Sequence, residues 1–152
     1  MARKYYFVSD LHMGGDGQLQ HCDYATEFIA FLKGLEQEGP DTELLIVGDT
    51  FGFWELTLVH GTKKLAHIIE AHQAIFDQLR VTGASIKVTM MVGNHDYDLA
   101  CDPAYLEMLQ RTCGRSLRHK AVPAPPGRHA LRLRCRLLRG VPRIVSRQGL
   151  GD

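Results

Sequence analysis

The chain has 152 residues, of which 45% are hydrophobic and 23% charged, which is typical of one globular domain with a modest core. Its N-terminal segment reaches a charged side chain after only four apolar or aromatic residues. It therefore predicts neither a secretory signal nor a membrane span. We expect a cytoplasmic protein, with peripheral association with the inner membrane as the alternative. Four cysteines without C-x-x-C spacing predict reduced thiols rather than a disulfide framework or a zinc knuckle.

The net charge of +1 hides an asymmetry along the chain. Residues 1–112 hold 8 basic and 16 acidic side chains, whereas residues 113–152 hold 10 basic and one acidic. We therefore divide the chain into a domain at 1–112 and an Arg/Pro-rich basic tail at 113–152. Three interpretations of the tail stay open: a patch that binds nucleic acid or anionic membrane, a solvated disordered segment, or a truncation or change of coding frame near Cys113. We favour the last, because patterning and acidic residues vanish there together.

Strands and helices are predicted to alternate through the first 112 residues. Short apolar runs predict strands at 5–8, 44–47 and 86–92, and apolar spacing of i, i+3, i+4, i+7 predicts helices at 24–37, 62–80 and 103–112. Gly83 is expected to end the second helix, and Asp102 with Pro103 to begin the third. Alternation of this kind predicts right-handed crossovers, a parallel sheet and an α/β fold. Beyond 112 the pattern fails, apart from one amphipathic strand predicted at 131–137.

Each of the three predicted strands runs directly into a polar cluster. These clusters are Asp10-x-His12, Gly48-Asp49 and Gly93-Asn94-His95-Asp96. Ligands collect at the carboxyl ends of parallel strands, because the loops converge there. Each cluster alone is typical of a turn or helix cap, but the three in order, each behind an apolar strand, predict one shared site.

The residue types in these clusters match a site for divalent metal ions. Carboxylates from Asp10 and Asp49, the imidazole of His12 and the amide oxygen of Asn94 are ligands that such ions accept. Asp49 is suited to bridge two metals, which together lower the pKa of a shared water and clamp a phosphate. His95, beside a ligand, is predicted to donate to a phosphate oxygen or to the leaving group.

The segments Ser9-Asp10-Leu11-His12, residues 47–54 and Val92-Gly93-Asn94-His95-Asp96 resemble the calcineurin-like metallophosphoesterase superfamily over about residues 1–110. The resemblance implies a sandwich of two sheets between helical layers, of which this chain would hold the N-terminal half. It also implies a first metal at Asp10, His12 and Asp49, a second metal at Asp49 and Asn94, and His95 as the catalytic residue. We expect two manganese ions, with iron, zinc or magnesium as alternatives.

Two departures from this family pattern affect the expected activity. The family usually has a carboxylate three residues after the bridging aspartate, where it orients the catalytic histidine, and here Gly52 stands there. Glu55 is a candidate substitute. The family also completes its metal shell with later histidines, whereas only His119 and His129 follow His95, and we assign neither a ligand role.

The leading hypothesis is a metal-dependent phosphoesterase that hydrolyses a phosphomonoester, phosphodiester or pyrophosphate with a metal-activated hydroxide. The motif Gly-Asp-x-Phe-x-Phe-Trp most resembles UDP-diacylglucosamine hydrolases, so a nucleotide-sugar lipid is one candidate substrate. The alternatives are a catalytically impaired fragment and a protein that binds nucleic acid or membrane through residues 113–152. Trp54 is predicted to lie in the core, and residues 14–17 to form a loop that admits substrate. The spacing of His60, His67 and His72 does not predict a zinc site.

Overall fold

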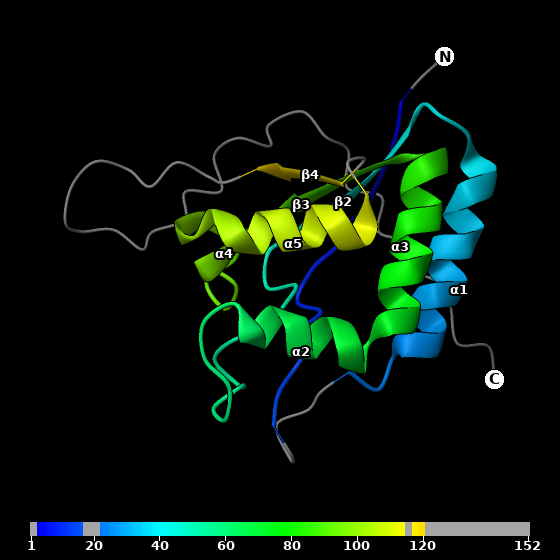
Figure 1. Ribbon diagram of the computed structural model, residues 1–152. Coiled ribbons are helices and arrows are strands. Elements are labelled where there is room, and N and C mark those ends of the chain that lie inside the picture. Colours follow the sequence, from blue (N-terminus) through cyan, green and yellow to red (C-terminus); the bar gives the residue numbers. More distant parts are fainter. Residues whose placement is uncertain (1–2, 17–21, 115–116, 121–152) are drawn as a thin grey trace.

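The computed structural model describes residues 3–16, 22–114 and 117–120, and it has an α/β fold (Figure 1). The elements in chain order are β1 (Lys4–Val8), α1 (Ala25–Leu35), a 3₁₀ turn (Glu36–Glu38), β2 (Thr42–Val47), α2 (Lys63–Ala71), α3 (Gln73–Ser85), β3 (Lys87–Met91), α4 (Asp98–Cys101), α5 (Pro103–Cys113) and β4 (Leu117–Lys120). The α/β class is confirmed. No helix among the described residues is both long enough and apolar enough to cross a lipid bilayer.

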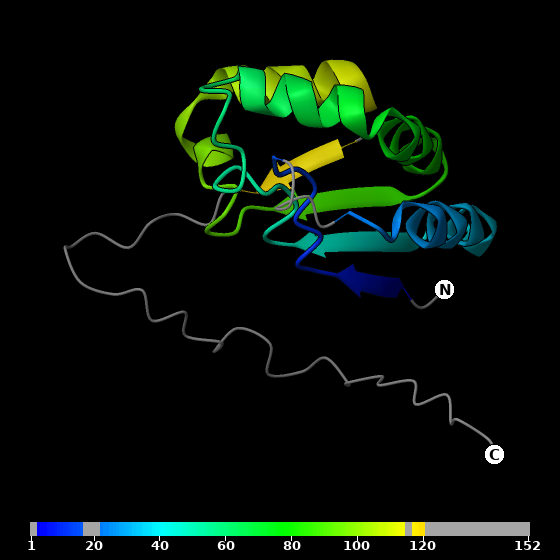
Figure 2. The ribbon, with the colours of Figure 1, turned by 90° about the horizontal axis from the view of Figure 1, so that it is seen from below.

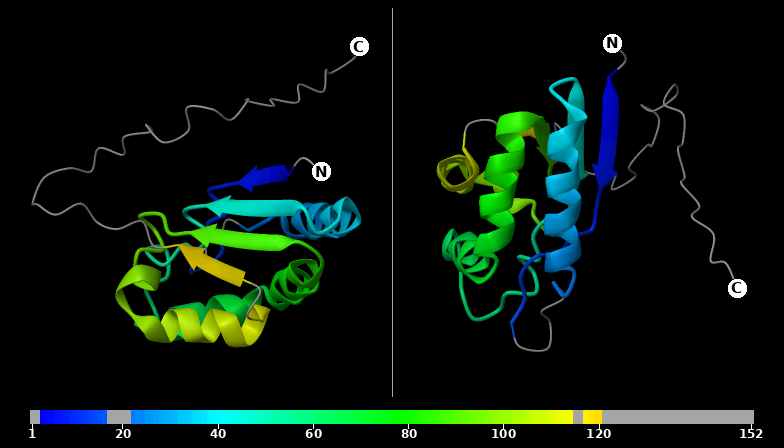
Figure 3. Two further views of the ribbon diagram at one scale, coloured as in Figure 1. Left: turned by 90° about the horizontal axis from the view of Figure 1, so that it is seen from above. Right: turned by 90° about the vertical axis from the view of Figure 1, so that its right-hand side faces the viewer.

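The strands form a parallel sheet in the order β1-β2-β3-β4, as the alternation predicts. Each crossover steps the same way along the sheet, and such crossovers are right-handed in nearly all proteins, so the connecting helices gather on one side (Figures 2 and 3). Within the described residues this is the one sheet, and a second sheet of the expected sandwich is not among them.

The two faces of the sheet differ in their exposure to solvent. Four side chains of the two central strands are fully buried on the face toward the helices: Leu44, Ile46, Val88 and Met90. Three large apolar side chains of β1 and β2 on the opposite face are 41–50% exposed: Tyr5, Phe7 and Val47. The core therefore lies between the sheet and the helices, with α3 packed between α1 and α5.

The predicted helix at 62–80 is two helices, which corrects the sequence analysis. His72 has φ −120° and ψ 30°, which separates α2 from α3. Helix α3 then runs through Gly83 to Ser85, so the prediction that Gly83 ends it is wrong. Burial of an apolar face that includes Phe76 outweighs the cost of about 1 kcal/mol for glycine in a helix.

The structure continues past residue 112, where the sequence pattern is weak. Helix α5 begins as predicted, with Pro103 in its first turn and the Asp102 carboxylate accepting a hydrogen bond from the Ala104 N–H at 2.9 Å. Strand β4 pairs with β3 in parallel, Val88 opposite Leu117. The strand predicted at 131–137 lies outside the described residues.

Candidate metal centre

The loops that leave β1 and β2 run side by side at the carboxyl end of the sheet. Because the two strands are parallel neighbours, their first polar residues arrive together. The Asp10 N–H donates to the Gly48 carbonyl at 3.4 Å, and the His12 N–H donates to the Asp49 carbonyl at 2.9 Å. Backbone hydrogen bonds thus hold Asp10, His12 and Asp49 at one place.

The backbone is left-handed at all three of these residues. Asp10 has φ 54°, His12 φ 44° and Asp49 φ 48°, and no other non-glycine residue in the described part of the chain has a positive φ. Such a conformation costs on the order of 1–3 kcal/mol per residue and persists where the surrounding structure enforces it. Its confinement to three predicted ligands indicates that their placement serves a function.

The side chains of these three residues meet in a geometry suited to a cation. Asp10, His12 and Asp49 each offer one ligand atom, and the three atoms all lie within 4.8 Å of one another. Two carboxylate oxygens and one imidazole nitrogen fit manganese, iron or zinc, and the carboxylates also suit magnesium. Asp10 is exposed and the other two are partly exposed, so solvent can reach the group.

Two glycines let the second and third loops approach closely enough to form the site. A Cβ on Gly93 would lie 2.2 Å from Asp49 Oδ1 and 2.3 Å from the Asp49 nitrogen. Gly48 has φ 75°, and a Cβ there would lie 3.1 Å from the Gly93 Cα. Any side chain at Gly93 would therefore displace the Asp49 carboxylate.

The buried side chain of Asp96 connects the loop after β2 to the loop after β3. This role was not assigned in the sequence analysis. The Asp96 carboxylate is fully buried and accepts hydrogen bonds from the backbone N–H groups of Gly93 at 2.6 Å and Thr50 at 2.8 Å. Burial raises the pKa of Asp96 above its ordinary value, and these hydrogen bonds oppose that rise. The last residue of Gly-Asn-His-Asp is therefore a buried structural support for the loops.

The predicted ligand of a second metal is Asn94, in the loop after β3. Asn94 follows Gly93 on the same loop and is exposed, so its amide is accessible. Its ligand role stays a prediction, as does the absence of one for His119 and His129, whose side chains lie outside the description.

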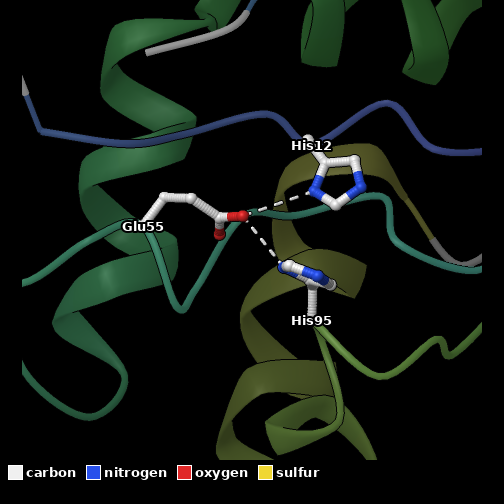
Figure 4. A group of neighbouring side chains, drawn as sticks. All are labelled: His12, Glu55 and His95. Atoms are coloured by element: carbon white, nitrogen blue, oxygen red, sulfur yellow. Dashed lines mark ion pairs between the residues drawn. The ribbon is translucent and has the colours of Figure 1, made fainter. Parts of the chain in front are cut away.

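His95 lies beside His12, and one carboxylate faces both imidazoles (Figure 4). Glu55 Oε1 is 2.9 Å from His95 Nδ1 and 3.6 Å from His12 Nδ1. The two imidazole rings are 4.4 Å apart between centroids and nearly perpendicular, at 81°. Glu55, a candidate in the sequence analysis, is therefore part of the site.

Trp54 is at the surface, so its predicted place in the core is wrong. Its side chain is 62% exposed, and its ring lies 4.4 Å from the His95 ring between centroids. Phe51 and Phe53 on either side of Gly52 fill the core and stack at 5.5 Å, and the turn that follows them directs Trp54 outward. The apolar character of residues 51–54 does not predict this turn.

A cavity of about 270 Å³ lies beside the loop that follows His12. Its lining includes Gly14, Gly15, Asp16, His67 and His72. Among the described residues, His67 and His72 do not belong to either group of side chains that could hold a metal ion. Admission of substrate by this loop stays a prediction.

The chain was compared with protein families, with curated proteins and with solved structures. A family model described as Calcineurin-like phosphoesterase matches residues 3–123, which include all three polar clusters and β4. No curated protein and no solved structure matches the chain.

Proposed function

The chain belongs to the calcineurin-like phosphoesterase family, and from this premise we propose that it hydrolyses phosphate esters with divalent metal held by Asp10, His12 and Asp49. The observation that carries the proposal is the convergence of three ligand atoms within 4.8 Å, on residues that share an enforced left-handed backbone. A structural role explains the hydrogen bonds of Asp96, but it does not explain two carboxylates and an imidazole gathered near solvent.

The reaction is a displacement at phosphorus by water. A divalent ion held by Asp10, His12 and Asp49 would lower the pKa of a nearby water and neutralise charge on the phosphate. The water oxygen forms the new bond to phosphorus and releases a proton, while the bond from phosphorus to the ester oxygen breaks. The leaving oxygen keeps the electron pair and takes the Nε2 proton of a His95 that is protonated at both ring nitrogens, and His95 then regains this proton from solvent; Nε2 points away from Glu55 (Figure 4).

A second metal ion, held by Asp49 and Asn94, is part of the proposal. The bridging role is supported by the position of Asp49 between the loops after β1 and β3, where its Oδ1 already accepts from the His95 N–H at 2.9 Å. Metal content of the purified protein, measured after loading with manganese and removal of free ion, tests it. Two ions per chain, falling to one in Asn94→Ala, are expected, and one ion per chain in both proteins contradicts the second site.

We place the substrate in the UDP-diacylglucosamine class, as a nucleotide-sugar lipid with a pyrophosphate. Phe51 and Phe53 are fully buried, so core packing explains them and they give no information about substrate. Trp54 is different, because its exposed ring beside His95 offers a flat surface to a bound molecule. Release of UMP from UDP-diacylglucosamine supports the class, and hydrolysis of simple esters alone overturns it.

The general activity is tested with an artificial ester. With manganese, the protein should release p-nitrophenol from bis(p-nitrophenyl) phosphate, and a chelator should stop the release. Asp49→Ala should abolish the activity, whereas Asp41→Ala, an exposed aspartate just before β2 at the opposite end of the sheet, should leave it unchanged. Equal rates for the wild type and Asp49→Ala would refute the proposal.

A further inference from the structure

The carboxylate of Glu55 lies close to the imidazoles of both His12 and His95. Glu55 Oε1 is 2.9 Å from His95 Nδ1 and 3.6 Å from His12 Nδ1, and Figure 4 shows all three side chains converging from separate loops. We infer that Glu55 is the positioning residue for both histidines, and that it supplies from position 55 the carboxylate that the family resemblance places at position 52. The inference rests on the proposed function and deepens it.

The room for Glu55 is provided by Gly52. A Cβ at Gly52 would lie 2.8 Å from Glu55 Oε2 and 3.3 Å from the Glu55 carboxyl carbon. Gly52 does not have a positive φ, so its backbone conformation does not require glycine. A side chain at position 52 would therefore displace the Glu55 carboxylate from the place it occupies, so the observed position of this carboxylate depends on Gly52.

The loop that carries Glu55 is held from both ends. The Asp16 N–H donates to the Glu55 carbonyl at 3.1 Å, and the Asp16 carboxylate accepts from the Leu58 N–H at 2.9 Å. On the other side the Gly52 N–H donates to the Met13 carbonyl at 2.9 Å. The carboxylate is thus placed by the fold, as a positioning group must be.

Charge and burial determine what the carboxylate does. Glu55 Oε2 and His95 Nδ1 are buried without an aligned hydrogen-bond partner among the described residues, so the 2.9 Å contact is electrostatic. A lone pair on Nδ1 of His95 would be repelled by the carboxylate at 2.9 Å, so this contact favours a proton on Nδ1, and the carboxylate at 3.6 Å favours the same tautomer of His12 more weakly. In neutral histidine this tautomer leaves Nε2 of His12 free to bind metal. It also leaves Nε2 of His95 on the side away from Glu55, where it can take up the second proton that is donated to the leaving group.

The first test needs no activity. Protein labelled with ¹⁵N-histidine and freed of metal is studied by long-range ¹H–¹⁵N NMR at one fixed pH of about 8. In the wild type we expect both His12 and His95 protonated at Nδ1. In Glu55→Ala both should move toward protonation at Nε2, and in Gly52→Asp/Glu55→Ala the new carboxylate should return His95 to Nδ1. Unchanged tautomers in Glu55→Ala overturn the inference.

The second test uses the manganese-loaded protein and two esters that differ in the basicity of the leaving group. Loss of an oriented proton donor should lower kcat by roughly 10–100-fold for the phenyl ester, less for the p-nitrophenyl ester, and leave KM unchanged. Glu55→Gln, which keeps the shape and removes the charge, should behave like Glu55→Ala. Glu70→Gln, an exposed glutamate on α2, is the matched control and should match the wild type.

The outcomes distinguish the positioning role of Glu55 from the proposed phosphoesterase activity. An equal loss of kcat for both esters means that Glu55 only stabilises the loop, which overturns the positioning role. A wild type that hydrolyses neither ester contradicts the proposed function, while the NMR result still decides whether Glu55 sets the tautomers. Recovery of the leaving-group pattern in Gly52→Asp/Glu55→Ala supports the exchange of positions, and failure to recover it in a folded protein contradicts that exchange.

Discussion

The Oδ1 atom of Asp49 accepts a hydrogen bond from the backbone N–H of His95 at 2.9 Å. This bond joins the loop after β2 to the loop after β3, and it fixes the orientation of the carboxylate in the folded protein. Metal binding therefore does not have to order this side chain. Fixing this side chain and keeping Asp49 in a left-handed backbone conformation both cost free energy. The rest of the folded domain supplies the stability that offsets this cost.

Replacement of Asp49 by asparagine should weaken metal binding while leaving the stability of the metal-free protein nearly unchanged. The amide oxygen can still accept from His95, so the metal-free protein should unfold within a few degrees of the wild type. A ligand present at about 1,000 times its dissociation constant stabilises a protein by about 4 kcal/mol, so manganese should raise the Tm of the wild type. It should not raise the Tm of Asp49→Asn. Circular dichroism measures both, with Asp41→Asn as control, and an equal rise in Asp49→Asn contradicts the ligand role.

Gly93→Ala should disrupt the site and the fold together. The added Cβ would lie 2.2 Å from Asp49 Oδ1 and 2.3 Å from its backbone nitrogen, so the loops must separate. We expect a loss of more than about 3 kcal/mol in the free energy of unfolding, measured by urea denaturation. Gly34→Ala is the contrasting variant. A Cβ at Gly34 on α1 meets nothing within 4 Å, so the same change should stabilise by about 0.5–1 kcal/mol. Similar effects at both positions would contradict the steric argument.

The convergence of the candidate metal ligands could be predicted from the sequence, because strand order and residue chemistry agree there. Each cluster follows an apolar strand, and parallel pairing brings consecutive strand ends together without further information. Asp10, His12 and Asp49 therefore converge as expected. Strand β4 was not predicted, because Leu-Arg-His-Lys has no apolar pattern and its place depends on pairing with β3.

The sequence offers Glu55 as a candidate for the missing carboxylate but cannot show where its side chain lies, because that depends on the path of a loop. Sequence distance from Asp49 says nothing about where the carboxylate of Glu55 points, and the turn is set by contacts with Asp16 and by the buried ring of Phe53. The same turn explains the wrong prediction for Trp54, since hydrophobicity alone assigns a tryptophan to the core. The break at His72 was missed because apolar spacing continues through it.

His72 should make the fold sensitive to acid. Burial lowers the pKa of His72 below its usual value, with the charge of His67 as a second cause. The folded state then binds fewer protons than the unfolded state near and below pH 6.5, so the free energy of unfolding falls as the pH falls through that range. His72→Leu should show a smaller fall between pH 7.5 and 5.5, measured by urea denaturation. His60→Gln, at an exposed position, should fall as the wild type does, and an unchanged slope in His72→Leu would contradict the assignment.

Cys113 should resist alkylation while the protein is folded. Burial raises the pKa of Cys113 to about 12, and only 2% of the residue is exposed at the end of α5. At pH 8 its thiolate fraction is then on the order of 10⁻⁴, against roughly a quarter for a free thiol, so it should react with iodoacetamide at least about 10³-fold more slowly than free cysteine. Cys101 is exposed and serves as the internal comparison. Peptide mass mapping after timed quenching follows both residues, and in guanidinium chloride their rates should become similar. Rapid modification of Cys113 in the folded protein would show that the end of α5 opens.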